Sequence, residues 1–153
     1  MAPVERHPLS VKLSPHPSQA EVTALLTACG LPSDDIDPGI LQDFYVARED
    51  SNPVGVVGLQ LFSGNALLRS LGVSQAARAH GLGTSLVRQA EQHAREHGAK
   101  QVYLLTNDAK AFFAKRGYAE VQRSVAPPEI RATSQFGSSC CSTAALMRKE
   151  LKA

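Results

Sequence analysis

The sequence has little of what several classes of protein require. Its 153 residues carry 16 Lys and Arg against 14 Asp and Glu, a net charge of +2, and no Lys/Arg run is longer than two residues. A nucleic-acid partner is therefore not implied. No stretch approaches the roughly 18 apolar residues that a membrane-spanning helix needs, and residues 1–10 contain no apolar segment of signal-peptide length. We expect a cytoplasmic protein with no membrane partner.

Cysteine and metal-ligand patterns are also sparse. Three cysteines, an odd number, do not indicate a disulfide framework, and the neighbours Cys140 and Cys141 would bridge only with strain. No Cys or His set has the spacing of a zinc site, so no metal is expected. His93 and His97 lie four apart without an evident carboxylate partner, and we interpret them as helix-surface residues.

The apolar periodicity indicates one α/β domain over residues 1–153. Leu82, Leu86, Ala90 and Ala94 recur every four residues and predict a helix that opens at glycine 81 and ends near glycine 98. Other helices are expected over 19–29 and from 109 towards 117. Strands are expected near residues 7–13, 44–47, 54–62, 66–73, 101–106, 118–121 and 143–147. This order predicts a mixed, mostly antiparallel sheet with helices on both faces.

A glycine-opened helix after a strand is a physical device for binding phosphate. The first turn of a helix leaves backbone N–H groups unpaired, and the helix dipole adds partial positive charge there. Gly81 and Gly83 lack a Cβ and let the backbone approach a bulky pyrophosphate. Arg78 can add a charge-assisted contact, and the hydroxyl of Thr84 falls in the first turn.

Other phosphate-binding loops fit less well. A Walker A loop ends in Gly-Lys-Ser/Thr, and the lysine is missing between Gly83 and Thr84 of this chain. A dinucleotide-binding fingerprint follows the first strand of a parallel unit, whereas this G-x-G comes mid-chain after three expected antiparallel strands.

Two motifs resemble the GNAT superfamily of N-acetyltransferases. The run from Leu71 to Gly83 is similar to its central motif, and the run from Ala109 to Tyr118 is similar to its second signature. The resemblance implies a single GNAT-like domain with a splayed central strand pair ending near Val73 and Thr106, and acetyl-coenzyme A as acyl donor. By this resemblance the cofactor-binding residues are Leu71, Val73, Arg78, His80, Gly81, Leu82, Gly83, Thr84, Thr106, Ala109 and Phe112.

The sequence departs from the family pattern where proton transfer is concerned. Phe113 stands where many relatives have a tyrosine that protonates the departing thiolate, and phenylalanine has no exchangeable proton. Thr106 stands where many have an asparagine, and the strand 66–73 contains no glutamate to act as base. A thioester is already activated, so positioning a neutral amine against it can supply much of the rate. No catalytic residue is assigned, and direct transfer in a ternary complex is expected.

A narrower resemblance concerns the acceptor. Residues 67–71 and the tail 127–147 are similar to the arsenic-resistance N-acetyltransferase branch, and residues 105–118 to glutamate N-acetyltransferases. Both imply a small amino-acid-like amine as substrate, including arsenic-containing or phosphinic amino acids. Arg69, Ser70 and Arg131 are then the candidate substrate-binding residues, because a guanidinium fork matches an oxyanion.

Two alternatives stay open at this stage. The acceptor could instead be a protein amine, which would need an open groove. The chain could also be a non-catalytic sensor of acyl-coenzyme A, which the missing tyrosine and base would suit. Homodimerisation through the C-terminal strands, as in many relatives, is a further expectation.

Overall fold

The structure is a computed structural model of the chain and describes residues 11–31, 33, 35–75, 77, 81–133, 136 and 144–151. Two compact units are present: unit 1 is Met1–Gly58 with Ser70–Ala90, and unit 2 is Leu59–Arg69 with Glu91–Ala153. Seven strands are ordered β1-β2-β3-β4-β5-β7-β6 in one sheet. The β4–β5 pairing is parallel, whereas β1–β2, β2–β3, β5–β7 and β6–β7 are antiparallel. The expected mixed, mostly antiparallel α/β sheet is confirmed.

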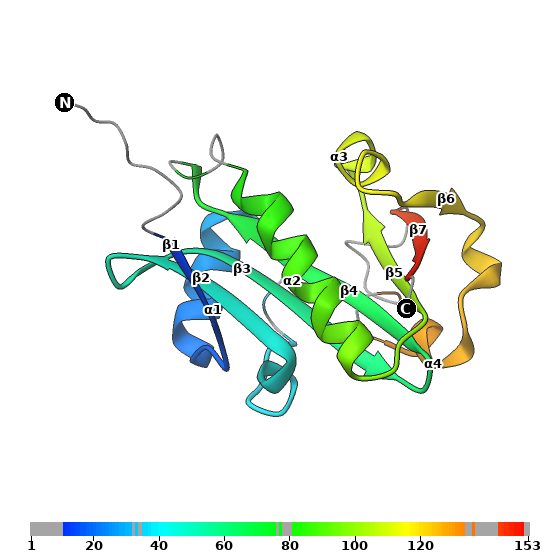
Figure 1. Cartoon of the computed structure of the whole chain (residues 1–153), viewed down its shortest axis with the longest axis horizontal. Helices are drawn as coiled ribbons and strands as arrows, with labels where there is room; N and C mark the ends of the chain where they lie inside the picture. The colour runs from blue at the N-terminus through cyan, green and yellow to red at the C-terminus, as the bar shows by residue number, and fades with distance from the viewer. Residues whose placement is uncertain are drawn as a thin grey trace. The chain divides into compact units, whose positions relative to one another are not determined.

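Unit 1 begins with an antiparallel group of strands. β1 (Val11–Pro15) pairs with β2 (Phe44–Glu49), and β2 pairs with the first part of β3 (Asn52–Phe62) (Figure 1). Between β1 and β2 lie α1 (Gln19–Ala28) and the 3-10 helix η2 (Ile40–Asp43). α1 starts at a capping box, in which the side chains of Ser18 and Glu21 each accept a hydrogen bond from the other's backbone N–H.

The two faces of the unit 1 strands are covered by different helices. On one face, Phe44, Val46 and Val56 are buried with apolar residues of α1. Side chains alternate along a strand, so Gly55 faces the other way. A Cβ added to Gly55 would lie 2.9 Å from Leu86 Cδ1 and 3.2 Å from Leu82 Cδ2, both on α2 (Leu82–Glu96). Helices therefore cover both faces here, as the sequence predicts.

Unit 2 is built around three paired strands. β5 (Gln101–Thr106) pairs with β7 (Ala145–Glu150), which in turn pairs with β6 (Ala119–Val121). The parallel register of β4 (Asn65–Val73) with β5 covers three pairs, Asn65↔Gln101 to Leu67↔Tyr103. The helical segments of this unit are α3 (Lys110–Ala114), η4 (Arg123–Val125) and α4 (Pro128–Arg131), besides the end of α2. One apolar cluster joins Leu67, Tyr103, Ala126, Ile130 and Leu146.

Some expected elements needed correction. β1 reaches Pro15 rather than ending at 13, because a proline without an N–H is tolerated on a strand at the edge of the sheet; residues 7–10 lie outside the described residues. No helix was expected where η4 and α4 lie, but Pro128 suits the first turn of a helix. β7 runs to Glu150 rather than 147, because its last residues pair with β5.

The helix expected from glycine 81 is confirmed as α2, and its apolar face is buried as predicted. His93 is a correction: it is 9% exposed and not a surface residue. Gly98 follows the helix with a positive φ of +84°, as expected of a C-terminal cap. Among the described residues, no helix combines the length and apolar character needed to cross a bilayer.

Candidate functional site

Strand β4 carries a local irregularity at a predicted substrate residue. Ser70 has φ +58°, a left-handed conformation that non-glycine residues seldom adopt within a strand. Strained backbone of this kind costs about 1–3 kcal/mol and is concentrated at functional sites. Ser70 therefore marks the point on β4 at which a functional role is most plausible on physical grounds.

The two candidate substrate arginines lie in different environments. Arg69 is 3% exposed, and its Nη1 donates to Gln60 Oε1 at 3.2 Å. Arg131 is the last residue of α4 and is exposed. A direct role for Arg69 in binding an acceptor would need its covering residues to move, whereas Arg131 is accessible. Their roles toward a substrate stay predictions.

The predicted phosphate loop is described from Gly81 onwards. Gly81 has φ +72°, which a residue without a Cβ adopts at little cost, and its carbonyl accepts the N–H of Ser85 at 3.2 Å. The first turn of α2 contains no acidic residue, so nothing in this turn repels an anion at the positive end of the helix dipole. Arg78 and His80 lie outside the described residues.

The other residues predicted to bind the cofactor in unit 1 differ in what they can present. Leu82 is 6% exposed and faces Gly55, so it offers its backbone rather than its side chain. Gly83 and Thr84 are half-buried in the first turn, as are Leu71 and Val73 at the end of β4. The carbonyl of Val73 accepts the thiol of Cys29 at 3.6 Å. In this region the backbone is thus the main group that can be presented to a ligand.

In unit 2, the end of β5 and the start of α3 hold the remaining predicted cofactor residues. Thr106 is 9% exposed, and its Oγ1 accepts the Ala109 N–H at 3.0 Å, which fixes the turn into α3. Phe112 is half-buried beneath the guanidinium of Arg116, whose Cζ lies 3.9 Å from the ring centroid. Phe113 is 5% exposed and packs edge-on against Tyr118 at 5.6 Å between centroids.

Tyr118 cannot replace the missing tyrosine hydroxyl. It is 3% exposed, and its hydroxyl donates to Glu91 Oε2 at 2.9 Å. Burial, reinforced by the negative charge of Glu91, raises the pKa of Tyr118 far above its ordinary value. Lys149 Nζ contacts both Glu91 oxygens at 3.0 and 3.1 Å. These three residues form a buried polar network, which we call the Glu91 network.

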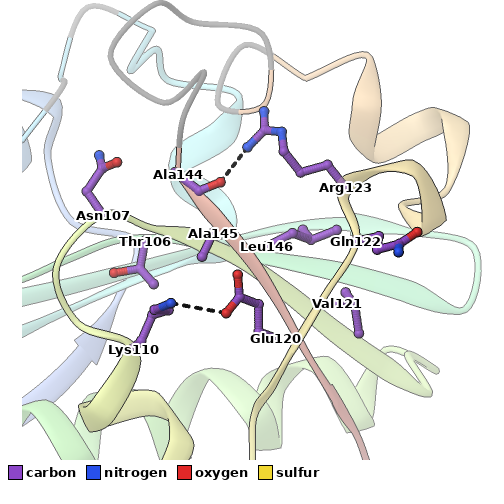
Figure 2. A pocket seen from close by; sticks show the side chains of 10 residues that line it. All are labelled: Thr106, Asn107, Lys110, Glu120, Val121, Gln122, Arg123, Ala144, Ala145 and Leu146. Carbon is purple, nitrogen blue, oxygen red and sulfur yellow. Dashed lines mark hydrogen bonds and ion pairs between the residues drawn. The ribbon is translucent and has the colours of Figure 1, made fainter.

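A pocket of about 370 Å³ opens at the carboxyl end of β5 (Figure 2). Lys110 Nζ and Glu120 Oε1 form an ion pair at 3.1 Å on one side of it. On the other side, the guanidinium of Arg123 donates to the carbonyls of Ala144 at 2.7 Å and Phe136 at 3.2 Å. The residues that line the pocket are Thr106, Asn107, Lys110, Glu120, Val121, Gln122, Arg123, Ala144, Ala145 and Leu146.

Sequence reasoning found only Thr106 of these lining residues. Lys110 directly follows Ala109 of the second signature, and its position offered a weak signal. The sequence held no signal for Glu120 and Gln122. They come to the end of β5 because β6 pairs with β7 and β7 pairs with β5.

The sequence profile of the Acetyltransferase (GNAT) family matches residues 16–118. The chain belongs to the GNAT acetyltransferase family. Both motifs singled out above fall within the matched region.

Named relatives and solved structures agree with the GNAT assignment. An uncharacterised N-acetyltransferase from Chlorobaculum tepidum is 32% identical over 91 residues, which cover 59% of this chain and 58% of the relative. An amino-acid acetyltransferase from Mycobacterium tuberculosis is 30% identical over 94 residues, which cover 59% of this chain and 53% of the relative. The matches thus span little more than half the length of these curated relatives.

A solved structure with the same fold is N-acetylglutamate synthase from Neisseria gonorrhoeae in complex with coenzyme A and N-acetyl-glutamate. It superposes with a TM-score of 0.79 at 20% identity, covering 94% of this chain and 35% of that one. At this identity the likeness concerns the fold alone.

Proposed function

We propose that the protein transfers an acetyl group from acetyl-coenzyme A to the amine of a small amino-acid-like molecule. The observation that carries this proposal is the helix start at Gly81, with its left-handed glycine and its first turn free of acidic residues, inside the region matched by the GNAT family. The names of an amino-acid acetyltransferase and of N-acetylglutamate synthase among similar proteins support an amino-acid-like acceptor.

The donor is held mainly by backbone. The N–H groups at the start of α2 face the pyrophosphate, with Arg78 adding charge, and the backbone around Leu71 and Val73 pairs with the pantetheine arm as a further strand would. Leu82 contributes through its N–H because its side chain is buried. These assignments rest on the family resemblance together with the described geometry.

The reaction needs no covalent enzyme intermediate. The lone pair of a neutral acceptor amine attacks the thioester carbonyl carbon, the new C–N bond forms, and the C–S bond breaks. The coenzyme A thiolate takes up one proton, and the acetylated nitrogen loses one to solvent through water. The amine of a free amino acid is mostly protonated at pH 7, so it attacks after losing a proton to water. Positioning against an activated thioester supplies much of the rate.

For the acceptor we propose an amino acid carrying an anionic, arsenic-containing or phosphinic group. The support is the sequence resemblance of residues 67–71 and 127–147 to the arsenic-resistance branch. Ser70, with its strained backbone, and the exposed Arg131 are the residues we propose to contact it, and Arg69 lies directly beside Ser70. Cys140 and Cys141 lie outside the described residues.

Release of free coenzyme A in the presence of primary amines tests this function. We expect turnover with amino-acid acceptors such as glutamate or phosphinic and arsenic-containing analogues, and little with lysine-containing peptides. Calorimetry should show acetyl-coenzyme A binding that a combined Arg78→Ala and Gly81→Val substitution abolishes. Arg48→Gln is the matched control, because it removes a cation that pairs with Glu21 and belongs to none of the proposed cofactor contacts. Absence of acetyl-coenzyme A binding by the wild type would refute the proposal.

A second candidate is a non-catalytic acyl-coenzyme A sensor. The observation that favours it is that Phe113 has no hydroxyl while the hydroxyl of Tyr118 is committed to Glu91. A sensor would bind acetyl-coenzyme A tightly and release no coenzyme A with any amine of the panel.

A further inference from the structure

We infer that the pocket at the end of β5 binds the carboxylate of the amino-acid acceptor, and that Glu120 is the resident counter-ion which this carboxylate displaces from Lys110. This inference rests on the proposed function, because the acceptor class is taken from it. It adds a binding site and names its residues, of which only Lys110 lies within one of the two motifs.

The first support is the ion pair on one side of the pocket. Lys110 and Glu120 are joined at 3.1 Å, and their side chains remain 56% and 53% exposed (Figure 2). An ion pair this exposed contributes little stability, typically below about 1 kcal/mol. A ligand carboxylate can therefore replace that of Glu120 at small cost, since one anion exchanges for another and the net charge around Lys110 is kept.

The second support is the hydroxyl of Thr106. Its oxygen accepts the Ala109 N–H, and the residue lines the pocket while being more than nine-tenths buried. Within the described part of the chain, its O–H hydrogen has no recorded acceptor, whereas a buried donor usually finds one. A carboxylate between Lys110 and Thr106 would take a charge-assisted hydrogen bond from each.

The third support is the fixed wall opposite the ion pair. Arg123 is engaged by the carbonyls of Ala144 and Phe136, and its Cζ lies 4.4 Å from the Phe136 ring centroid. Arg123 therefore shapes the pocket and is not counted as a ligand. A volume of about 370 Å³ lies at the small end of the range for small-molecule sites, which suits a free amino acid better than a peptide segment.

The proposal gives opposite signs for two substitutions that break the same ion pair. Lys110→Gln removes the cation and should weaken carboxylate binding about tenfold, the worth of one charge-assisted hydrogen bond. Glu120→Gln removes the competitor and should strengthen binding several-fold. If the ion pair were only structural, both variants would behave alike. Arg48→Gln, which breaks the Arg48–Glu21 pair of unit 1, is the matched control.

The experiment is an NMR titration of the coenzyme A-saturated protein with L-glutamate and with its dimethyl ester. The amide signals of Thr106 and Asn107 should move with glutamate and stay in place with the ester. The dissociation constants should follow the order Lys110→Gln, then wild type and Arg48→Gln together, then Glu120→Gln as the tightest.

Three outcomes would overturn the inference: no shift of these amides with glutamate, equal shifts with the ester, or changes of the same sign in both pocket variants. Weaker acetyl-coenzyme A binding by Lys110→Gln with unchanged glutamate binding would assign Lys110 to the donor instead, and would also overturn it. The proposed function is judged separately, by acetyl-coenzyme A binding and coenzyme A release in the wild type.

Discussion

The two compact units of the chain differ in whether they bury polar side chains. In the part of the chain that the structure describes, every residue recorded as buried and polar or charged belongs to unit 2: Arg69, Glu91, His93, Thr106 and Thr133. Unit 1 buries apolar residues against α1 and keeps its Glu21–Arg48 ion pair partly exposed. Burying a polar group costs free energy unless it is hydrogen-bonded, so unit 2 needs compensation that unit 1 does not.

The groups that the two units can present to a ligand differ in kind. Unit 1 contributes mainly backbone, through the left-handed Gly81 and the end of β4, which suits binding of a donor that is the same in every turnover. Unit 2 contributes side chains, through Thr106, Lys110 and Glu120, which suits selection of one acceptor among many. Side chains can change between related proteins without altering the fold, whereas a backbone cradle depends on the fold itself.

The largest expected effect comes from breaking the Glu91 network. Glu91→Ala leaves the Lys149 ammonium and the Tyr118 hydroxyl without their carboxylate, and loss of one partner of a buried pair costs about 3–5 kcal/mol. Urea denaturation measures the loss of unfolding free energy.

Glu21→Ala in unit 1 is the matched comparison, because it removes a glutamate from a partly exposed pair. We expect it to cost no more than about 1–2 kcal/mol, since the capping box is lost as well. Equal costs for Glu91→Ala and Glu21→Ala would show that burial of charge does not distinguish the two units.

The next effect tests the apolar packing of unit 1. A Cβ on Gly58 would overlap the Phe44 ring, which is fully buried and has no room to shift. Gly58→Ala should therefore destabilise the protein by about 1–3 kcal/mol, the usual cost of overpacking a core. Thermal unfolding checks this. Phe44→Leu introduced together with Gly58→Ala should recover part of the loss, and no recovery would place the cause outside this contact.

A smaller effect is expected where a glycine is needed for conformation rather than space. A Cβ on Gly81 would meet nothing within 4 Å, but φ is +72°. Gly81→Ala should cost about 1 kcal/mol of stability, and acetyl-coenzyme A affinity should fall because the strained turn no longer presents its N–H groups well. Gly64→Ala, at φ +78° and equally open, is the control, which should lose stability but keep affinity.

The sequence predicted best what depends on local periodicity and short-range motifs. Three features could be predicted: the apolar face of α2, the strands before it and the glycine-opened helix start. The residues responsible for each lie close together in the sequence. It could not predict the Glu91 network, whose members are 27 and 58 residues apart. Nothing in the local pattern of α2 marks Glu91 as buried, yet it is 4% exposed.

The pocket was missed for the same reason. Thr106 was identified by its place in a family motif, but Glu120 reaches the pocket only through the pairing of β6 with β7 and of β7 with β5. Arg69 was identified as a candidate by its strand position, yet its burial against Gln60 follows from β3, which periodicity alone does not place beside it.

The smallest effect concerns the pH dependence of unit 1. Burial alone would raise the pKa of Glu21, but the Ser18 N–H at 2.7 Å and the Arg48 guanidinium at 2.7 Å outweigh it and lower the pKa below its ordinary value. A lowered pKa means that the charged form stabilises the fold at neutral pH, and that this contribution is lost as the pH falls through the folded-state pKa.

Glu21→Gln should therefore cost about 0.5 kcal/mol at pH 7 and almost nothing at strongly acidic pH, so its stability curve between neutral and acid should be flatter than that of the wild type. Urea midpoints measured across this range check the convergence, and Glu49→Gln, a glutamate at the end of the neighbouring strand β2, serves as the control for a generic loss of one negative charge. A constant difference at all pH values would mean that Glu21 acts in the capping box through shape and hydrogen bonding rather than through its charge.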